Sequence, residues 1–152
     1  MRLTGALVLS LIAGPLLAKE RLGAYQSWAA FKDAEIPRCY AIGSPDESSG
    51  TGGYVSVGFW PKRGLSHQLN VRLSRIRSSD AGITLSVGGR RFQLTVDGNT
   101  GRAKDRAMDL AIIAAMRSSQ SMSVQSSGIT DAYALRGAAS AIDAAALGCA
   151  GK

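Results

Sequence analysis

The chain has 152 residues, of which 45% are apolar and 19% are charged, and it carries a net charge of +7. This length is enough for one domain with its own buried core, and it excludes a minidomain that depends on a metal ion or a partner to fold. The positive charge favours partners that present an anionic surface.

Residues 1–18 have the pattern of a secretory signal peptide: Arg2, an apolar run over residues 6–13, a Gly-Pro break, and Ala18 before two charged residues. We expect cleavage close to Ala18, which leaves residues 19–152 as a single exported domain in the periplasm. The apolar run is shorter than the roughly twenty residues of a membrane span, and no later run is longer, so the mature chain should have no transmembrane span. Without the leader the net charge is +6, because Arg2 is its only charged residue.

Two aromatic and β-branched segments, residues 25–32 and 38–42, predict strands that pair as a hairpin. The polar loop over residues 43–53 is too poor in apolar residues to pack and is expected to be mobile. Four further strands are predicted over residues 54–60, 68–74, 83–87 and 90–96. The second of these alternates most clearly, with Leu69 and Val71 pointing inward, so one face of the sheet should be solvated.

The segment over residues 105–117 predicts a helix that is apolar on more than one side, because Leu110 and Ile113 widen a stripe centred on Ile112. Asp105 and Asp109 in its first turns and Arg117 at its end complement the helix dipole. A hairpin of two short strands should follow, and then an alanine-rich helix that stops at Gly148. These three segments span residues 121–125, 132–136 and 137–147.

Together these elements predict a mainly β (α+β) fold. We expect an antiparallel curled sheet or a β-sandwich of about eight strands, with two helices in the C-terminal third. The helix over residues 105–117 should cover one apolar face of the sheet.

Export would place the domain in an oxidising compartment, where its two cysteines, Cys39 and Cys149, are an even pair. We therefore expect a disulfide between them. Two cysteines and one histidine cannot supply a four-ligand zinc site without carboxylates, and no CxxC spacing suggests a redox pair. The sequence has no Walker A loop, GxGxxG fingerprint or metal-ligand cluster, so no cofactor is expected.

His67 is the only histidine, and no serine or carboxylate stands at a motif spacing from it. Nucleophilic catalysis needs a base held against a nucleophile and a group that orients the base, and the sequence contains no GxSxG elbow. We expect that the protein is not an enzyme. The alternative is a periplasmic hydrolase that uses a site around His67.

The basic residues are the best candidates for binding. Lys62 and Arg63 follow an aromatic pair, with Pro61 between, and Arg90 and Arg91 begin a predicted strand. Grouped on one face, these four could contact an anionic envelope surface such as lipopolysaccharide, phospholipid head groups, peptidoglycan or an acidic protein. The alternative is a solvated basic face that keeps an exported protein soluble. Nucleic acid is not an expected partner, because the leader removes the protein from most of it.

Several short motifs occur in one order along the chain. They are a signal peptide, Trp28, Cys39-Tyr-Ala-Ile-Gly-Ser-Pro45, Phe92 in Arg-Arg-Phe-Gln-Leu, a helix ending Ile112-Ile-Ala-Ala-Met-Arg117, Asp131-Ala-Tyr-Ala-Leu-Arg-Gly137, and an alanine-rich helix closing on Cys149. In this order they resemble the invasion-associated locus B family of alphaproteobacterial exported proteins, over nearly the whole mature chain. The resemblance implies a periplasmic or envelope-associated protein, linked in some pathogens to host-cell entry, with no established catalytic residues to carry over.

Overall fold

The computed structural model describes residues 19–78 and 80–150. The predicted leader, residues 1–18, lies outside this part of the chain. Within residues 19–150, leaving out position 79, no helix has both the length and the apolar character needed to cross a membrane.

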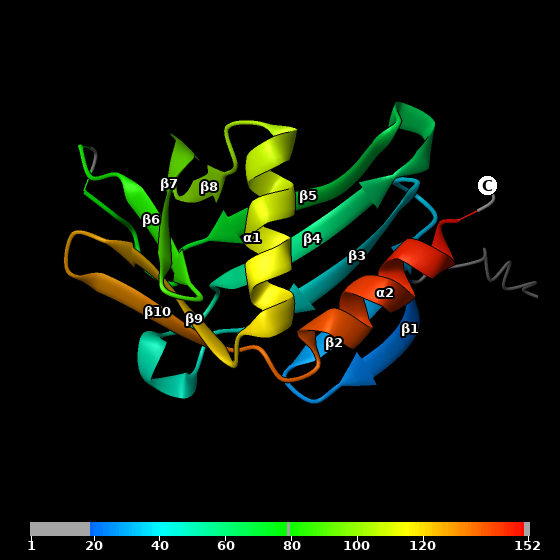
Figure 1. Cartoon of the computed structure of the whole chain (residues 1–152), viewed down its shortest axis with the longest axis horizontal. Coiled ribbons are helices and arrows are strands. Elements are labelled where there is room, and N and C mark those ends of the chain that lie inside the picture. Colours follow the sequence, from blue (N-terminus) through cyan, green and yellow to red (C-terminus); the bar gives the residue numbers. More distant parts are fainter. Residues whose placement is uncertain (1–18, 79, 151–152) are drawn as a thin grey trace, which may run out of the picture.

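Ten strands in the described residues form one antiparallel sheet, with the order β1-β2-β3-β4-β5-β8-β7-β6-β9-β10. The predicted mainly β (α+β) class is confirmed, and the curled sheet is the form that the structure adopts (Figure 1). The strands are β1 (Glu20–Tyr25), β2 (Trp28–Asp33), β3 (Arg38–Gly43), β4 (Tyr54–Trp60), β5 (Leu65–Arg72), β6 (Ile83–Val87), β7 (Arg90–Asp97), β8 (Thr100–Arg102), β9 (Ser121–Ser126) and β10 (Ile129–Ala134).

The sheet bends at β7, which belongs to both of its halves. The first part of β7 pairs with β6, whereas its last three residues, from Thr95 to Asp97, pair with β8. The bend brings the first strands of the sheet near its last strand. The indole Nε1 of Trp28 on β2 donates to the carbonyl oxygen of Ala134 on β10 at 2.9 Å. The sheet is therefore strongly curled but remains open.

Both helices, α1 (Arg106–Ser118) and α2 (Ala138–Gly148), lie on the same side of the sheet (Figure 1). We call the face beneath them the inner face and the opposite one the outer face. Alternate residues of the strands are buried on the inner face, as the period of two requires. The helix α1 buries Ile112, Ile113 and Met116 there, and α2 packs on β1, β2 and β3 through small alanines.

The start of α1 carries both predicted acidic residues, Asp105 at the N-cap and Asp109 in the first turn. Asp105 caps the helix by accepting a hydrogen bond from the backbone N–H of Met108 at 2.8 Å. Asp109 lies in the first turn as predicted, and the structure adds that it is buried and accepts from the backbone N–H of Leu69 on β5 at 2.9 Å. β8 pairs with β5 only from Asn70 onward, so the N–H of Leu69 has no partner on β8. The Asp109 carboxylate accepts the hydrogen bond from this N–H instead.

Two strands were not predicted, and one was displaced. The predicted strand over residues 25–32 crosses a turn at Gln26, which has a positive φ of 55°, so β1 and β2 are separate strands. The sequence of β1 mixes charges with glycine and lacks alternation, and β8 is only three residues long. The strand β10 begins earlier than expected, because the hairpin closes in a tight turn at Ser127 and Gly128.

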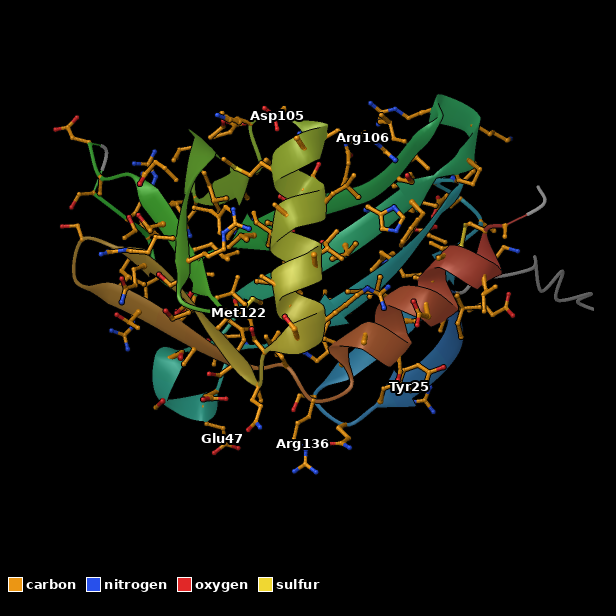
Figure 2. All side chains as sticks on the ribbon, viewed as in Figure 1. Tyr25, Glu47, Asp105, Arg106, Met122 and Arg136 are labelled. Carbon is orange, nitrogen blue, oxygen red and sulfur yellow. A yellow bond between two sulfur atoms is a disulfide. The ribbon has the colours of Figure 1, made fainter. Side chains whose placement is uncertain are left out.

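The prediction that the polar loop over residues 43–53 does not pack is wrong. Its short 3₁₀ helix η1 (Glu47–Ser49; Glu47 is labelled in Figure 2) lies against the free edge of β10. The backbone N–H of Asp46 donates to the carbonyl of Ala132 at 2.7 Å, and the N–H of Ala132 donates to the Ser49 hydroxyl at 3.0 Å. The loop thus packs through hydrogen bonds rather than apolar contacts. It covers the edge of β10, which would otherwise be open to pairing with another strand.

The predicted disulfide is present. Cys39 on β3 is bonded to Cys149, the residue that directly follows α2, with the two Cα atoms 5.8 Å apart. The bridge joins residues 110 positions apart in the chain and fixes the end of α2 to the inner face of the sheet.

Candidate functional site

The outer face of the first half of the sheet carries two rows of side chains that face away from the helices. Strand pairing sets Tyr40 on β3 beside Gly58 on β4 and Gln68 on β5. It likewise sets Ser56 beside Asn70 and Arg102. Because residues two apart share one face of a strand, these positions form one continuous surface over β3, β4, β5 and β8.

This surface is hollowed. The hollow has a volume of about 180 Å³, and we call it the basic-aromatic groove. Gly58, one of its lining residues, has no side chain, and the Trp60 ring lies over this glycine, so that a Cβ atom there would collide with the indole. The residues that define the groove are Arg38, Tyr40, Trp60, Arg63, Asn70 and Arg102.

Three arginines reach the groove from different elements. Arg38 comes from β3, Arg102 comes from β8, and Arg63 ends the short 3₁₀ helix η2 (Pro61–Arg63) between β4 and β5. No Asp or Glu lines the groove. The three guanidinium groups therefore make it a site of positive potential that suits an anion, and their planar donor forks match carboxylate and phosphate oxygens.

Arg38 is held in place by its neighbours. Its guanidinium lies 4.7 Å from the centre of the Tyr40 ring, which in turn stacks on Phe31 at 5.6 Å. Its Nε is 3.8 Å from the Asp33 carboxylate, whose other oxygen accepts from the backbone N–H groups of Glu35 and Ile36. Asp33 thus positions Arg38 from the side and leaves the groove itself without a negative charge.

Two polar atoms of the groove are buried and have no hydrogen-bond partner. They are Nε of Arg38 and Oδ1 of Asn70, which are two of only four such side-chain atoms in the described part of the chain. Buried polar atoms are almost always hydrogen-bonded in folded proteins. Both residues line the groove, so a ligand there could supply the missing partners once the two shielded atoms turn toward it.

The four basic residues expected to share a surface lie in different places. Arg63 lines the groove, whereas Lys62 lines a separate apolar pocket of about 290 Å³ beside Cys149. Arg90 and Arg91 line a separate, shallow hollow of about 680 Å³ at the β6–β7 turn. Neither the groove nor this hollow is lined by both pairs.

Arg38, Asn70 and Arg102 were not singled out from the sequence. Alternation places Arg38 and Asn70 outward, which is the signal that could have found these two. Arg102 lies on the three-residue strand β8, whose sequence carries no such signal. Their proximity depends on the order in which strands pair, and alternation alone does not give that order.

His67 lies apart from the groove. Its ring packs edge-on against Phe59 with 4.8 Å between ring centres, and its Nδ1 is 3.2 Å from the hydroxyl of the adjacent Ser66. Arg106, at the start of α1 (Figure 2), donates to the same hydroxyl at 3.1 Å. Burial lowers the pKa of His67, and the charges of Arg106 and Arg117 lower it further.

No carboxylate hydrogen-bonds to His67 among the residues that the structure describes. The closest electrostatic candidate, Asp143 on α2, forms an ion pair with Arg117 at 2.7 Å. The described residues also contain no group of three or more His, Cys, Asp or Glu side chains that could hold a metal ion. The arrangement can therefore bind an anion at the groove, whereas the surroundings of His67 lack a group that would orient it as a base.

Comparison of the chain with protein-family models, with curated proteins and with solved structures found no match.

Proposed function

We propose that this protein is an exported, non-catalytic binding protein of the cell envelope and that it holds an anionic partner in the basic-aromatic groove. The observation that carries the proposal is that Arg38, Arg63 and Arg102 surround a hollow lined by no carboxylate. Long-range attraction to such a site speeds the encounter with an anionic ligand, and bidentate hydrogen bonds would then hold it.

The periplasm is the proposed compartment. The leader pattern over residues 1–18 supports export, and the Cys39–Cys149 bridge is compatible with it, because disulfides persist where the environment is oxidising. Membership of the invasion-associated locus B family is part of the same proposal and rests on the order of the sequence motifs.

A hydrolase centred on His67 has less support. The Ser66 hydroxyl near its Nδ1 already accepts a hydrogen bond from Arg106, and no carboxylate of the described chain orients the imidazole. An activated nucleophile requires both a base at hydrogen-bond distance and an orienting partner for that base.

The proposal is tested with the mature protein, residues 19–152, and with dextran sulfate as an anionic probe and unmodified dextran as its neutral match. Binding to dextran sulfate should weaken as salt is added, and unmodified dextran should not bind. The double variant Arg63→Glu and Arg102→Glu should lose most of the binding. The double variant Arg90→Glu and Arg91→Glu has the same change in charge and should retain it. Equal losses in both would contradict the groove as the contact site.

A further inference from the structure

We propose that the basic-aromatic groove takes one ring of an acidic saccharide, that is, a sugar that carries a carboxylate beside its hydroxyl groups. This inference rests on the proposed function, because it names the chemical class of the anionic partner. In this arrangement the Trp60 ring lies against a face of the sugar, the arginines contact its carboxylate, and Asn70 contacts a hydroxyl.

The size of the groove favours one ring of a longer chain. Pockets that enclose a whole small molecule usually have volumes of roughly 300–1,000 Å³. The groove, at about 180 Å³, is smaller and lies on the outer face of an open sheet. A linear saccharide can seat one ring there while its neighbouring rings extend along the strands.

Trp60 is the aromatic platform that remains available. One side of the groove is formed by Tyr40, but its ring already contacts Phe31 and the Arg38 guanidinium. Trp60 lies over Gly58, is partly exposed, and has no ring partner in the described part of the chain. An indole offers a broad apolar face to a ligand that has polar groups elsewhere, and the C–H face of a pyranose ring meets that description.

The unpartnered atoms distinguish a sugar acid from a simple anion. Nε of Arg38 is 3.8 Å from the Asp33 carboxylate and has no acceptor at hydrogen-bond distance, which an anion could supply, whereas Oδ1 of Asn70 needs a donor. A carboxylate or a sulfate ester has no hydrogen to donate. A sugar hydroxyl both donates and accepts, and the neutral side chains of Ser56 and Gln68, which also line the groove, can bind such groups. A ligand that combines an anionic group with hydroxyls therefore suits the two unpartnered atoms, Ser56 and Gln68 together.

The experiment compares four probes by calorimetric titration of the mature, disulfide-bonded protein. Two are acidic saccharides, the tetramers of galacturonate and of mannuronate. The third is a neutral galactose tetramer, and the fourth is tetraglutamate, which has the carboxylates without the sugar. We expect at least one uronate tetramer to bind roughly tenfold or more tightly than either control, the difference that one or two added hydrogen bonds make.

Two variants locate the ring. Trp60→Ala and Asn70→Ala should each weaken binding of the uronate tetramer by roughly tenfold and leave that of tetraglutamate unchanged. Arg91→Ala, in the hollow at the β6–β7 turn, is the control and should change neither.

A measurement on the wild-type protein avoids any question of folding. Trp28 is only 2% exposed, so quenching by acrylamide reports on Trp60, and the uronate should protect it.

The outcomes separate the two proposals. Tetraglutamate that binds as tightly as both uronates would overturn the saccharide inference and leave an anion-binding groove. Failure of the uronates, of tetraglutamate and of dextran sulfate to bind would overturn both. Uronate binding without protection of Trp60, or with full affinity in Trp60→Ala, would overturn the location of the ring.

Discussion

The carboxylate of Asp109 on α1 accepts a hydrogen bond from the backbone N–H of Leu69 on β5, at the point where β5 loses its pairing with β8. The bond joins a helix to the edge of a strand and gives a buried amide its partner. On the opposite face of the sheet, Asn70 lies in the groove next to Arg102, its pairing partner. The contact between Asp109 and Leu69 therefore steadies β5 directly behind the candidate site.

Removing the carboxylate should destabilise the domain. Asp109→Ala leaves the N–H of Leu69 buried without an acceptor, which costs roughly 1–3 kcal/mol. Asp109→Asn keeps an acceptor and should cost less. Urea denaturation of both variants measures the difference, and equal stability of Asp109→Ala and the wild type would contradict the role assigned to this contact.

The same pair of residues predicts a pH dependence. Burial raises the pKa of Asp109 above its ordinary value of 3.8, although the bond from Leu69 and the charge of Arg106 act in the opposite direction. A raised pKa in the folded state means that the part of the stability linked to protonation of Asp109 is complete below 3.8 and is lost as the pH rises through the folded value. Asp109→Asn should therefore gain stability relative to the wild type between pH 3.5 and pH 7. A stability difference between Asp109→Asn and the wild type that does not change with pH would exclude a raised pKa at Asp109.

His67 should have the opposite dependence. Its pKa is lowered from 6.5 mainly by burial, so its contribution to stability is complete above 6.5 and is lost as the pH falls through the folded value. The variant His67→Asn suits the positive φ of 55° at this position and cannot take up the proton. Between pH 7 and pH 5 the wild type should lose more stability than the variant. Parallel stability curves would contradict the prediction, and NMR titration of the imidazole measures the pKa directly.

The disulfide should make a large contribution to stability. A bridge that closes a loop of about 100 residues contributes about 4–5 kcal/mol on the chain-entropy model, which corresponds to roughly 10–20 °C in Tm. Replacing Cys39 and Cys149 together by alanine should lower Tm by up to that amount. Hydrogen exchange should then show that α2 loses its protection before the strands do, because the bridge holds its end. An unchanged Tm, or a uniform loss of protection, would contradict this.

Much of the fold follows from local patterns in the sequence. The alternation of Leu69 and Val71 and the helical spacing around Ile112 each correspond to an observed element. The strands β1 and β8 have no such pattern. β8 contains Gly101 on its inner face, where a Cβ atom would lie 2.9 Å from Leu94, so this strand is defined by close packing against β7 rather than by its own composition.

The candidate site was only partly predictable. Arg63 was identified because it follows Trp60, and both line the groove. Arg38, Asn70 and Arg102 are distant in sequence and meet because β3, β4, β5 and β8 are neighbours in the sheet. Alternation predicts that Arg38 and Asn70 point outward but gives no signal for Arg102 on β8, and the pairing order that joins the three depends on the bend at β7 and on tertiary packing.

The proposed function requires that an anionic ligand occupies the outer face of β3, β4, β5 and β8. Its most direct test is a ¹⁵N-resolved NMR titration of the mature protein with dextran sulfate. We predict that shift changes centre on the Trp60 indole N–H, the Arg63 and Arg102 amides and the Asn70 side-chain amide. The amides around Arg90, Arg91 and Ser123 should remain unchanged. Changes confined to those three residues, or spread evenly over all basic residues, would contradict the claim.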